Sequence, residues 1–343
     1  MADSVLYAPN VHTGGGLVLL RGLLADWPAA GRRTAFLDER ARQLLHLPSD
    51  VDVRWVQARV ASRLAAELGL QRAARPGHTV LCFHGLPPLL RNAARVVVFQ
   101  QNRNYLGLNP LSDFAPRTAV RLAFERLVAR RLRHRVSEYV VQTPTMAHAL
   151  TRWYGPGCPP VRVLPFVDAW PARATPSATR FDFVYVADGE AMKNHKHLLQ
   201  AWQLLAAQGL RPSLALTLGT RDAALAARIE GAARTHGLQV HNLGQMTREE
   251  VLKLYASARA LVFPSISESF GLPLVEAAHF GLPIVAAELD YVRDVCTPAQ
   301  TFDPQSPVSM ARAVRRFLDA AEPPIAIGTA AALWAALTED GAA

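Results

Sequence analysis

Two glutamates, Glu268 and Glu276, flank a seven-residue stretch in which a loop after a β-strand leads into a helix. The apolar strand ends at Phe263, and the helix is expected to begin near Leu272. Pro273 suits the first helical turn, and Gly271 loosens the turn before it. This spacing predicts Glu268 in the loop at the end of the strand and Glu276 near the second turn of the helix.

The start of this helix has the chemistry of an anion site. The amides of Phe270, Gly271 and Leu272 are expected to be free, and the helix dipole adds positive potential. Two nearby carboxylates would repel a plain phosphate but suit a ligand with both a diphosphate and hydroxyl groups, such as a nucleotide-sugar. Glu276 would accept hydrogen bonds from the ribose diol and Glu268 from the transferred sugar. The alternative is that Glu276 only complements the dipole and Glu268 is solvated.

The elements that position these residues alternate between strands and helices along the whole chain, which predicts an α/β protein with parallel sheets. Thr247, with Glu250 three residues on, predicts a helix start with a capping box. In the first half we expect strands at 5–8, 79–83, 95–99 and 138–142, with a glycine turn at 14–16 before a helix at 17–27. In the second half we expect strands at 181–187, 213–218, 239–243, 260–263 and 283–287, and helices at 195–207, 223–235, 248–257 and 272–280.

A length of 343 residues is typical of about two domains. Six prolines between Pro156 and Pro176 disfavour a regular helix there. We therefore predict an N-terminal, acceptor-side domain at 1–166, a hinge at 167–178 and a donor-binding domain at 179–320. A final helix at 321–343 would pack back on the first domain. Doubly wound sheets bind ligands where strands lead into helices.

The string from Glu268 to Ala277 resembles the paired-glutamate signature of retaining glycosyltransferases with the GT-B fold, in the large group 1 that contains many bacterial mannosyltransferases. The resemblance implies two Rossmann-like domains with a cleft between them. It also implies transfer of a sugar from a nucleotide diphosphate to an acceptor hydroxyl with retention of anomeric configuration, with neither a metal nor a covalent enzyme nucleophile. The resemblance is strong over residues 181–318 and looser before them.

The segment from Tyr185 to Lys196 is similar to the family's loop that places cations on the donor diphosphate, which assigns that role to Lys193 and Lys196. Family members often carry an arginine about six residues before the first lysine, where this chain has Ala187 and Asp188. One expected phosphate cation is therefore missing or replaced. The alternative for Lys193 is an ordinary surface lysine beside a helix cap.

The same resemblance assigns further site residues. A segment ending in Gln245 and Met246 is similar to the one that lies along the nucleobase, and His84 follows a strand where related enzymes present a histidine to the sugar. The alternative for His84 is a residue that caps a turn. Further candidates are the glycine loop with Gly15 and Gly16, and Gln101 and Asn102 on the acceptor side.

In the mechanism that the resemblance implies, Glu268, Lys193 and His84 are the catalytic residues. The leaving phosphate oxygen takes the acceptor proton, while Lys193 and the helix amides absorb its charge. A string from Asp290 to Asp294 resembles enzymes of lipopolysaccharide and O-antigen assembly, which suggests a glycan or lipid-linked acceptor. The base, the sugar and the linkage stay open.

The formal charge of +9 admits an anionic partner. Residues 117–135 hold seven arginines among apolar residues, a pattern that fits a helix on an anionic membrane surface or an arginine-rich solvated face. No nucleic-acid motif accompanies the charge, so a nucleic-acid-binding protein is the weaker alternative, and a nucleotide-sugar epimerase on the same scaffold is another. Three scattered cysteines and the lack of a signal-like start predict a cytoplasmic protein.

Overall fold

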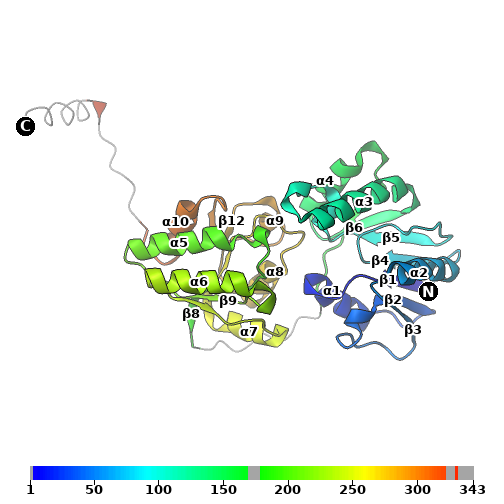
Figure 1. Cartoon of the computed structure of the whole chain (residues 1–343), viewed down its shortest axis with the longest axis horizontal. Coiled ribbons are helices and arrows are strands. Elements are labelled where there is room, and N and C mark those ends of the chain that lie inside the picture. Colours follow the sequence, from blue (N-terminus) through cyan, green and yellow to red (C-terminus); the bar gives the residue numbers. More distant parts are fainter. Residues whose placement is uncertain (1–2, 169–177, 322–328, 331–343) are drawn as a thin grey trace, which may run out of the picture.

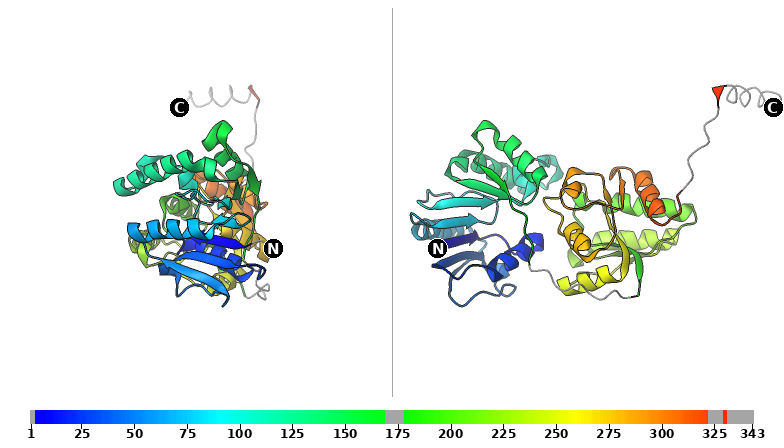
Figure 2. Two further views of the ribbon diagram at one scale, coloured as in Figure 1. Left: turned by 90° about the vertical axis from the view of Figure 1, so that its right-hand side faces the viewer. Right: turned by 180° about the vertical axis from the view of Figure 1, so that it is seen from behind.

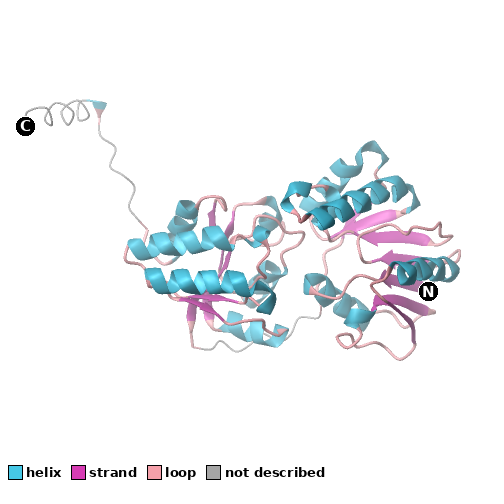
Figure 3. Ribbon diagram, in the orientation of Figure 1, coloured by secondary structure: helices cyan, strands magenta, loops and turns pink. Residues whose placement is uncertain are grey.

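The protein folds into two α/β domains that stand side by side (Figures 1 and 2). The structure, a computed structural model, describes residues 3–168, 178–321 and 329–330. The hinge expected at 167–178 and the C-terminal helix expected at 321–343 fall almost wholly outside these residues. Both sheets are parallel throughout, and helices lie over them (Figure 3).

The first domain contains a seven-stranded parallel sheet in the order β3-β2-β1-β4-β5-β6-β7. Its last strand, β7, comes from the proline-rich segment, so that part of the segment extends the sheet. The strands are β1 (Ser4–Ala8), β2 (Arg33–Asp38), β3 (Val51–Val56), β4 (Thr79–Cys82), β5 (Arg95–Phe99), β6 (Glu138–Val141) and β7 (Val161–Val163). The helices are α1 (Gly14–Ala25), α2 (Val60–Ala73), α3 (Pro116–Leu132) and α4 (Pro144–Tyr154).

The second domain contains a six-stranded parallel sheet in the order β10-β9-β8-β11-β12-β13. The strands are β8 (Phe181–Tyr185), β9 (Leu214–Leu216), β10 (Val240–Asn242), β11 (Ala258–Phe263), β12 (Ile284–Ala287) and β13 (Gln300–Phe302). The helices are α5 (His195–Ala207), α6 (Ala223–His236), α7 (Arg248–Ala256), α8 (Leu272–Phe280), α9 (Asp290–Arg293) and α10 (Pro307–Phe317).

The sequence pattern identified most of these elements because the central strands of a doubly wound sheet are apolar on both faces. β11 buries its last four residues, and β12 buries all four of its residues. The predictions of α5 and α8 are confirmed to the residue. The capping box of α7 is confirmed as well, since Thr247 accepts from the Glu250 amide and Glu250 from the Thr247 amide.

The glycine turn predicted at 14–16 is wrong, because these glycines form the first turn of α1. Gly14 has a φ of +64°, and the two glycines after it continue directly into the helix. The leucines that follow explain the difference: Leu17, Leu20 and Leu24 are buried against the sheet, and their packing extends the helix back through residues of poor helical propensity.

Each sheet reverses its strand order at one point, and both points face the contact between the domains. In the first sheet β1 lies between β2 and β4, and in the second β8 lies between β9 and β11. At such a switch point the loops that leave two neighbouring strands run in opposite directions and leave room for a ligand. The loops in question follow β1, β4, β8 and β11.

No helix among the described residues is long and apolar enough to cross a membrane. The three cysteines, Cys82, Cys158 and Cys296, are free thiols.

Candidate active site at the domain contact

The first turns of α1 and α8 meet across the domain contact. A Cβ added to Gly15 would lie 3.1 Å from Leu272 Cδ1, so the two turns are in close contact and a larger residue at position 15 would require Leu272 to shift. Neither helix has a side-chain cap on its N-terminus, and neither has an acidic residue in its first turn. Two helix ends with free amides therefore face the same place, which is favourable for an anion.

The end of α8 that faces this place is built by an unusual backbone. Gly271 caps the helix with a φ of +78°, in the left-handed region that favours glycine. No hydrogen bond within the described chain engages the amides of Phe270, Gly271 and Leu272. Phe270 itself is buried, so its ring anchors the turn. The amides singled out in the sequence are thus free donors.

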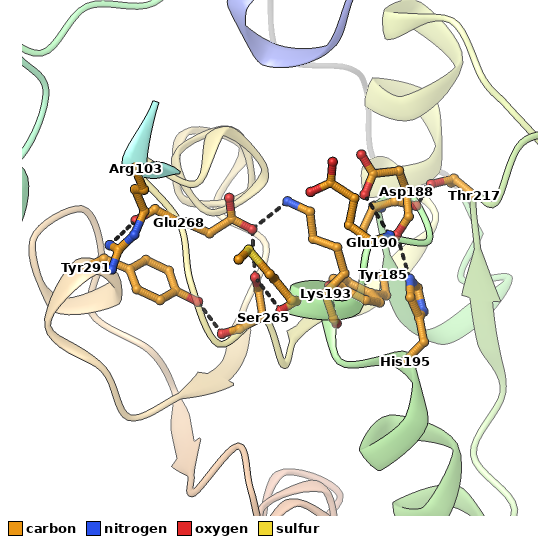
Figure 4. Close-up of polar contacts among 12 residues, drawn as sticks. Arg103, Tyr185, Asp188, Glu190, Lys193, His195, Thr217, Ser265, Glu268 and Tyr291 are labelled. Atoms are coloured by element: carbon orange, nitrogen blue, oxygen red, sulfur yellow. Dashed lines mark hydrogen bonds and ion pairs between the residues drawn. The ribbon is translucent and has the colours of Figure 1, made fainter. Parts of the chain in front are cut away.

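Glu268 and Lys193 form a partly buried ion pair at the second switch point (Figure 4). Lys193 Nζ lies 2.7 Å from Glu268 Oε1, and the Ser265 hydroxyl donates to the same oxygen at 2.7 Å. Burial opposes the charge on Lys193, but the Glu268 carboxylate and its hydrogen bond raise the pKa of the ammonium. Lys193 is therefore a fixed cation.

The loops that carry this pair are tied together by hydrogen bonds to main-chain carbonyls. The Asn194 amide group donates to the carbonyls of Pro264 and Pro304, at 3.1 and 2.7 Å. The Ile266 amide donates to the Met192 carbonyl at 2.9 Å. Asn194 has a φ of +61° and caps α5 without a side-chain bond, so its side chain joins the two loops instead. The ion pair therefore rests on a rigid base.

Glu276 lies in the second turn of α8 and is only 8% exposed. The Tyr255 hydroxyl donates to Glu276 Oε2 at 3.4 Å, and Arg248 Nε lies 3.7 Å from Oε1. Burial raises the pKa of Glu276, while Arg248 opposes the rise. Arg248 also pairs with Asp168 at 2.9 Å, which links Glu276 to the segment that leaves the first domain.

His84 follows β4 and packs edge-on against Tyr7, with ring centroids 5.2 Å apart. Its Nδ1 lies 3.3 Å from the Tyr7 carbonyl oxygen. Burial lowers the pKa of His84 to about 4, although the Tyr7 carbonyl opposes this. His84 is therefore a neutral imidazole at physiological pH, able to hydrogen-bond a sugar but not to offer a full charge.

The acceptor-side candidates divide into two kinds. Gln101 donates to the Phe83 carbonyl at 3.0 Å, and its amide lies 3.3 Å from a Cβ added to Gly16, so it belongs to the cluster of loops at the first switch point. The Asn102 side chain instead accepts from the Asn104 amide at 3.0 Å and caps a short 3₁₀ helix. Asn102 thus has a local structural role.

The remaining candidates belong to the second domain. Lys196 is exposed in the first turn of α5. Gln245 lies beside Gly219, 3.2 Å from a Cβ added there, at the end of β9. Met246 packs against the core of the second domain.

The loop that departs from the family pattern carries carboxylates where family members often have an arginine. Around Ala187 the chain offers Asp188 and Glu190, and burial together with the Asp188 charge raises the pKa of Glu190. The Asp188 carbonyl holds the His195 ring at 2.8 Å. The sequence carries no arginine between Ala187 and Met192, and the first cation along this loop is Lys193.

Several site residues were missed in the sequence. Ser265 and Tyr291 support the Glu268 loop, since the Tyr291 hydroxyl donates to the Ser265 carbonyl at 2.5 Å. Arg103 reaches the same loop from the first domain. The sequence could have identified Arg103 as a site residue, because it directly follows Gln101 and Asn102, past the end of β5. No sequence pattern identified Arg248 as one.

The two domains with their facing switch points define the GT-B class of fold. The Anabaena protein HepE, solved with UDP and glucose, superposes with a TM-score of 0.68 at 14% identity over 93% of this chain and 90% of its own. Sucrose-phosphate synthase from Thermosynechococcus elongatus gives 0.68 at 16% identity over the same shares. These likenesses confirm the predicted fold.

Residues 167–334 match the family described as glycosyl transferases group 1. This match places the second half of the chain in the group 1 glycosyltransferase family, as predicted from the Glu268 motif.

Among curated relatives, O-antigen chain mannosyltransferase B of Escherichia coli is 36% identical over 115 residues, 33% of this chain and 30% of the relative. Serotype-specific mannosyltransferase WbdA of Escherichia coli is 29% identical over 143 residues, 40% of this chain and 17% of the relative. A glycogen synthase of Mycobacterium tuberculosis is 29% identical over 204 residues, 57% of this chain and 48% of the relative. The chain thus spans under half of the length of each of these relatives.

Proposed function

We propose that this protein transfers a sugar from a nucleotide diphosphate sugar to an acceptor hydroxyl. The observation that carries the proposal is the Lys193–Glu268 pair beside the meeting first turns of α1 and α8. A diphosphate fits the free amides and the Lys193 ammonium, and a sugar fits the carboxylate next to them. The names of the relatives make mannose the first sugar to test.

The proposed chemistry needs stabilisation of a departing diphosphate. As the glycosidic bond breaks, negative charge grows on the leaving oxygen, and Lys193 with the two helix ends is placed to receive it. Glu268 orients the sugar, neutral His84 hydrogen-bonds it from the other domain, and Glu276 holds the ribose. The leaving oxygen then takes the acceptor proton on the same face, so the new bond retains the anomeric configuration. In this proposal Lys193 and the helix amides stabilise the negative charge of the leaving diphosphate, without a bound metal.

The test is incubation of the purified protein with UDP- and GDP-sugars, with and without candidate glycan acceptors, in EDTA and in Mg²⁺. We expect release of one nucleoside diphosphate, and an α-linked product from an α-linked donor by NMR. An inverted linkage would contradict retention, and loss of turnover in EDTA would contradict metal-free transfer. An epimerised donor without nucleotide release would instead identify an epimerase.

We further propose that the acceptor is lipid-linked and that α3 rests on the inner face of the cytoplasmic membrane. Val120, Phe124 and Leu127 are 72, 66 and 60% exposed on one side of α3. Arg117, Arg121 and Arg131 are exposed on the same side. Glu125, the single carboxylate of the helix, is half-buried. Apolar side chains flanked by cations suit an anionic lipid surface better than a neutral one.

Co-sedimentation with vesicles tests this surface. We expect binding to phosphatidylcholine vesicles that contain phosphatidylglycerol and weak binding to phosphatidylcholine alone. Changing Val120, Phe124 and Leu127 to serine should weaken binding by at least about tenfold, since each side chain contributes roughly 1 kcal/mol or more on burial. The control changes Leu64 and Leu68, exposed on α2, to serine. Equal effects of the two sets would refute the α3 surface.

A further inference from the structure

Arg103 extends from the first domain to the loop that carries Glu268 (Figure 4). It is the first residue of a 3₁₀ helix (Arg103–Leu106) that follows β5. Its Nη1 donates to the main-chain oxygen of Glu268 at 2.6 Å. Arg126 supports this helix by donating to the Asn104 carbonyl at 2.7 Å. The base of Arg103 is therefore fixed in one domain while its tip contacts the other.

The side chain of Arg103 is costly to place where it lies. Burial lowers the pKa of its guanidinium, against the attraction of Glu268, and its Nε is buried without a hydrogen-bond partner. Within the described chain no carboxylate forms an ion pair with it. A partly buried cation held by one carbonyl contributes little to stability. Its position therefore indicates a role at the site rather than in folding.

A second contact supports the same loop from the same domain. The Thr143 hydroxyl donates to the Ser269 carbonyl at 3.3 Å. Two residues on, the Thr145 amide donates to the Asp294 carboxylate at 2.9 Å. The first domain thus contacts the main chain at two consecutive residues of the Glu268 loop. The side chain of Glu268, in contrast, is held by Lys193 and Ser265 of its own domain.

We infer that Arg103 is a positioning residue for sugar transfer, which fixes the Glu268 loop only while the two domains are in contact. This inference rests on the proposed function. When the domains separate, the loop loses the contacts to the Glu268 and Ser269 carbonyls. Lys193 and Ser265 alone then hold the carboxylate, on a loop that is no longer fixed relative to the sugar. Assembly of the donor site is in this way coupled to domain contact, and donor turnover is restricted to the form that has both domains around it. Nucleotide binding to the second domain does not require Arg103.

The experiment compares Arg103→Ala and Arg103→Lys with wild type. Calorimetry measures the affinity for GDP and UDP, and nucleotide release measures kcat with the corresponding nucleotide-sugar. We expect Arg103→Ala to keep the nucleotide Kd within about twofold but to lower kcat by on the order of 100-fold, the scale of a misplaced catalytic group. Arg103→Lys, which still donates to a carbonyl, should recover part of kcat. Arg54→Ala, on the surface of the first domain, is the matched control.

The outcomes separate the inference from the proposed function. An unchanged kcat in Arg103→Ala overturns the inference, as does a loss of nucleotide affinity equal to the loss of kcat. If wild type binds and turns over no nucleotide-sugar, the proposed function fails. Small-angle X-ray scattering then tests the domain contact by measuring the radius of gyration. The double variant Arg103→Ala with Thr143→Val should show a larger radius of gyration than wild type. An unchanged radius there overturns the inference independently.

Discussion

Replacing Glu276 by glutamine tests the ribose site with the least disturbance of the fold. Glutamine keeps the size of the side chain and one acceptor oxygen, while the charge is removed. Glu276 is buried, and within the described part of the chain it accepts one long hydrogen bond, from Tyr255, with Arg248 Nε 3.7 Å away. The carboxylate is therefore only loosely engaged, and the ribose hydroxyls would be its best donors.

The expected loss follows from one charge-assisted hydrogen bond. Such a bond contributes about 1.5 to 3 kcal/mol, which corresponds to about a 10- to 150-fold weaker nucleotide Kd in Glu276→Gln. Glu276→Ala should lose both ribose contacts and fall at or beyond the upper end of this range. The change should leave the unfolding temperature near that of wild type, because the charge of Glu276 is itself unfavourable where it lies.

Calorimetry with ribonucleotides and their 2′-deoxy and 3′-deoxy analogues is the assay. Wild type should bind the ribonucleotide more tightly than at least one analogue, and Glu276→Gln should bind the two with nearly equal affinity. Glu230→Gln, exposed on α6, is the control for loss of one carboxylate. If wild type does not distinguish the sugars, or the variant still does, Glu276 does not hold the ribose.

Three further changes test other parts of the site. Lys193→Ala should lower donor turnover by roughly 100- to 1000-fold, because it removes the cation nearest the leaving group. The control, Lys196→Ala, should change turnover by less than about threefold. Equal effects of the two changes would contradict the placement of Lys193. Burial lowers the pKa of His84 to about 4. Between about pH 6.5 and 4 this histidine is therefore protonated in the unfolded chain but neutral in the folded protein. The folding stability is complete above about pH 6.5 and declines as the pH falls towards 4. Thermal melts across this range should show wild type losing roughly 1 to 3 kcal/mol more than His84→Gln, and parallel curves would show that His84 is not desolvated. Gly15→Val should separate the first turns of α1 and α8 and weaken nucleotide-sugar binding. Gly231→Ala, with nothing within 4 Å of its Cβ, should leave binding unchanged. Normal binding by Gly15→Val would mean that the two turns do not enclose the donor.

The parts of this protein that the sequence predicts are those in which local pattern and burial agree. Helix α8 and the loop before it follow from a buried strand, a glycine and a proline, so the places of Glu268 and Glu276 could be predicted. The glycines at the start of α1 could not be assigned from local propensity. They are helical because leucines later in the helix pack on the sheet, which is a tertiary effect.

Contacts between the domains could not be predicted from the sequence for a different reason. Arg103 and Glu268 are 165 residues apart, and nothing in either local pattern indicates the other. The structural use of Asn102 was equally hidden, because an asparagine after a strand can cap a turn or face a ligand with the same local sequence. Only the spatial arrangement of the two sheets separates these possibilities.

The contact between the N-termini of α1 and α8 has an electrostatic consequence for the order in which the products leave. Each helix end carries about half a positive charge, so pressing two of them together without a counterion between them is unfavourable. A bound diphosphate reverses the sign of that interaction and draws the halves of the molecule towards each other. After transfer the nucleoside diphosphate carries one more negative charge than it did as a sugar ester, and so it is held more firmly than before. The glycosylated product should then leave first, with departure of the nucleotide setting the pace of the cycle.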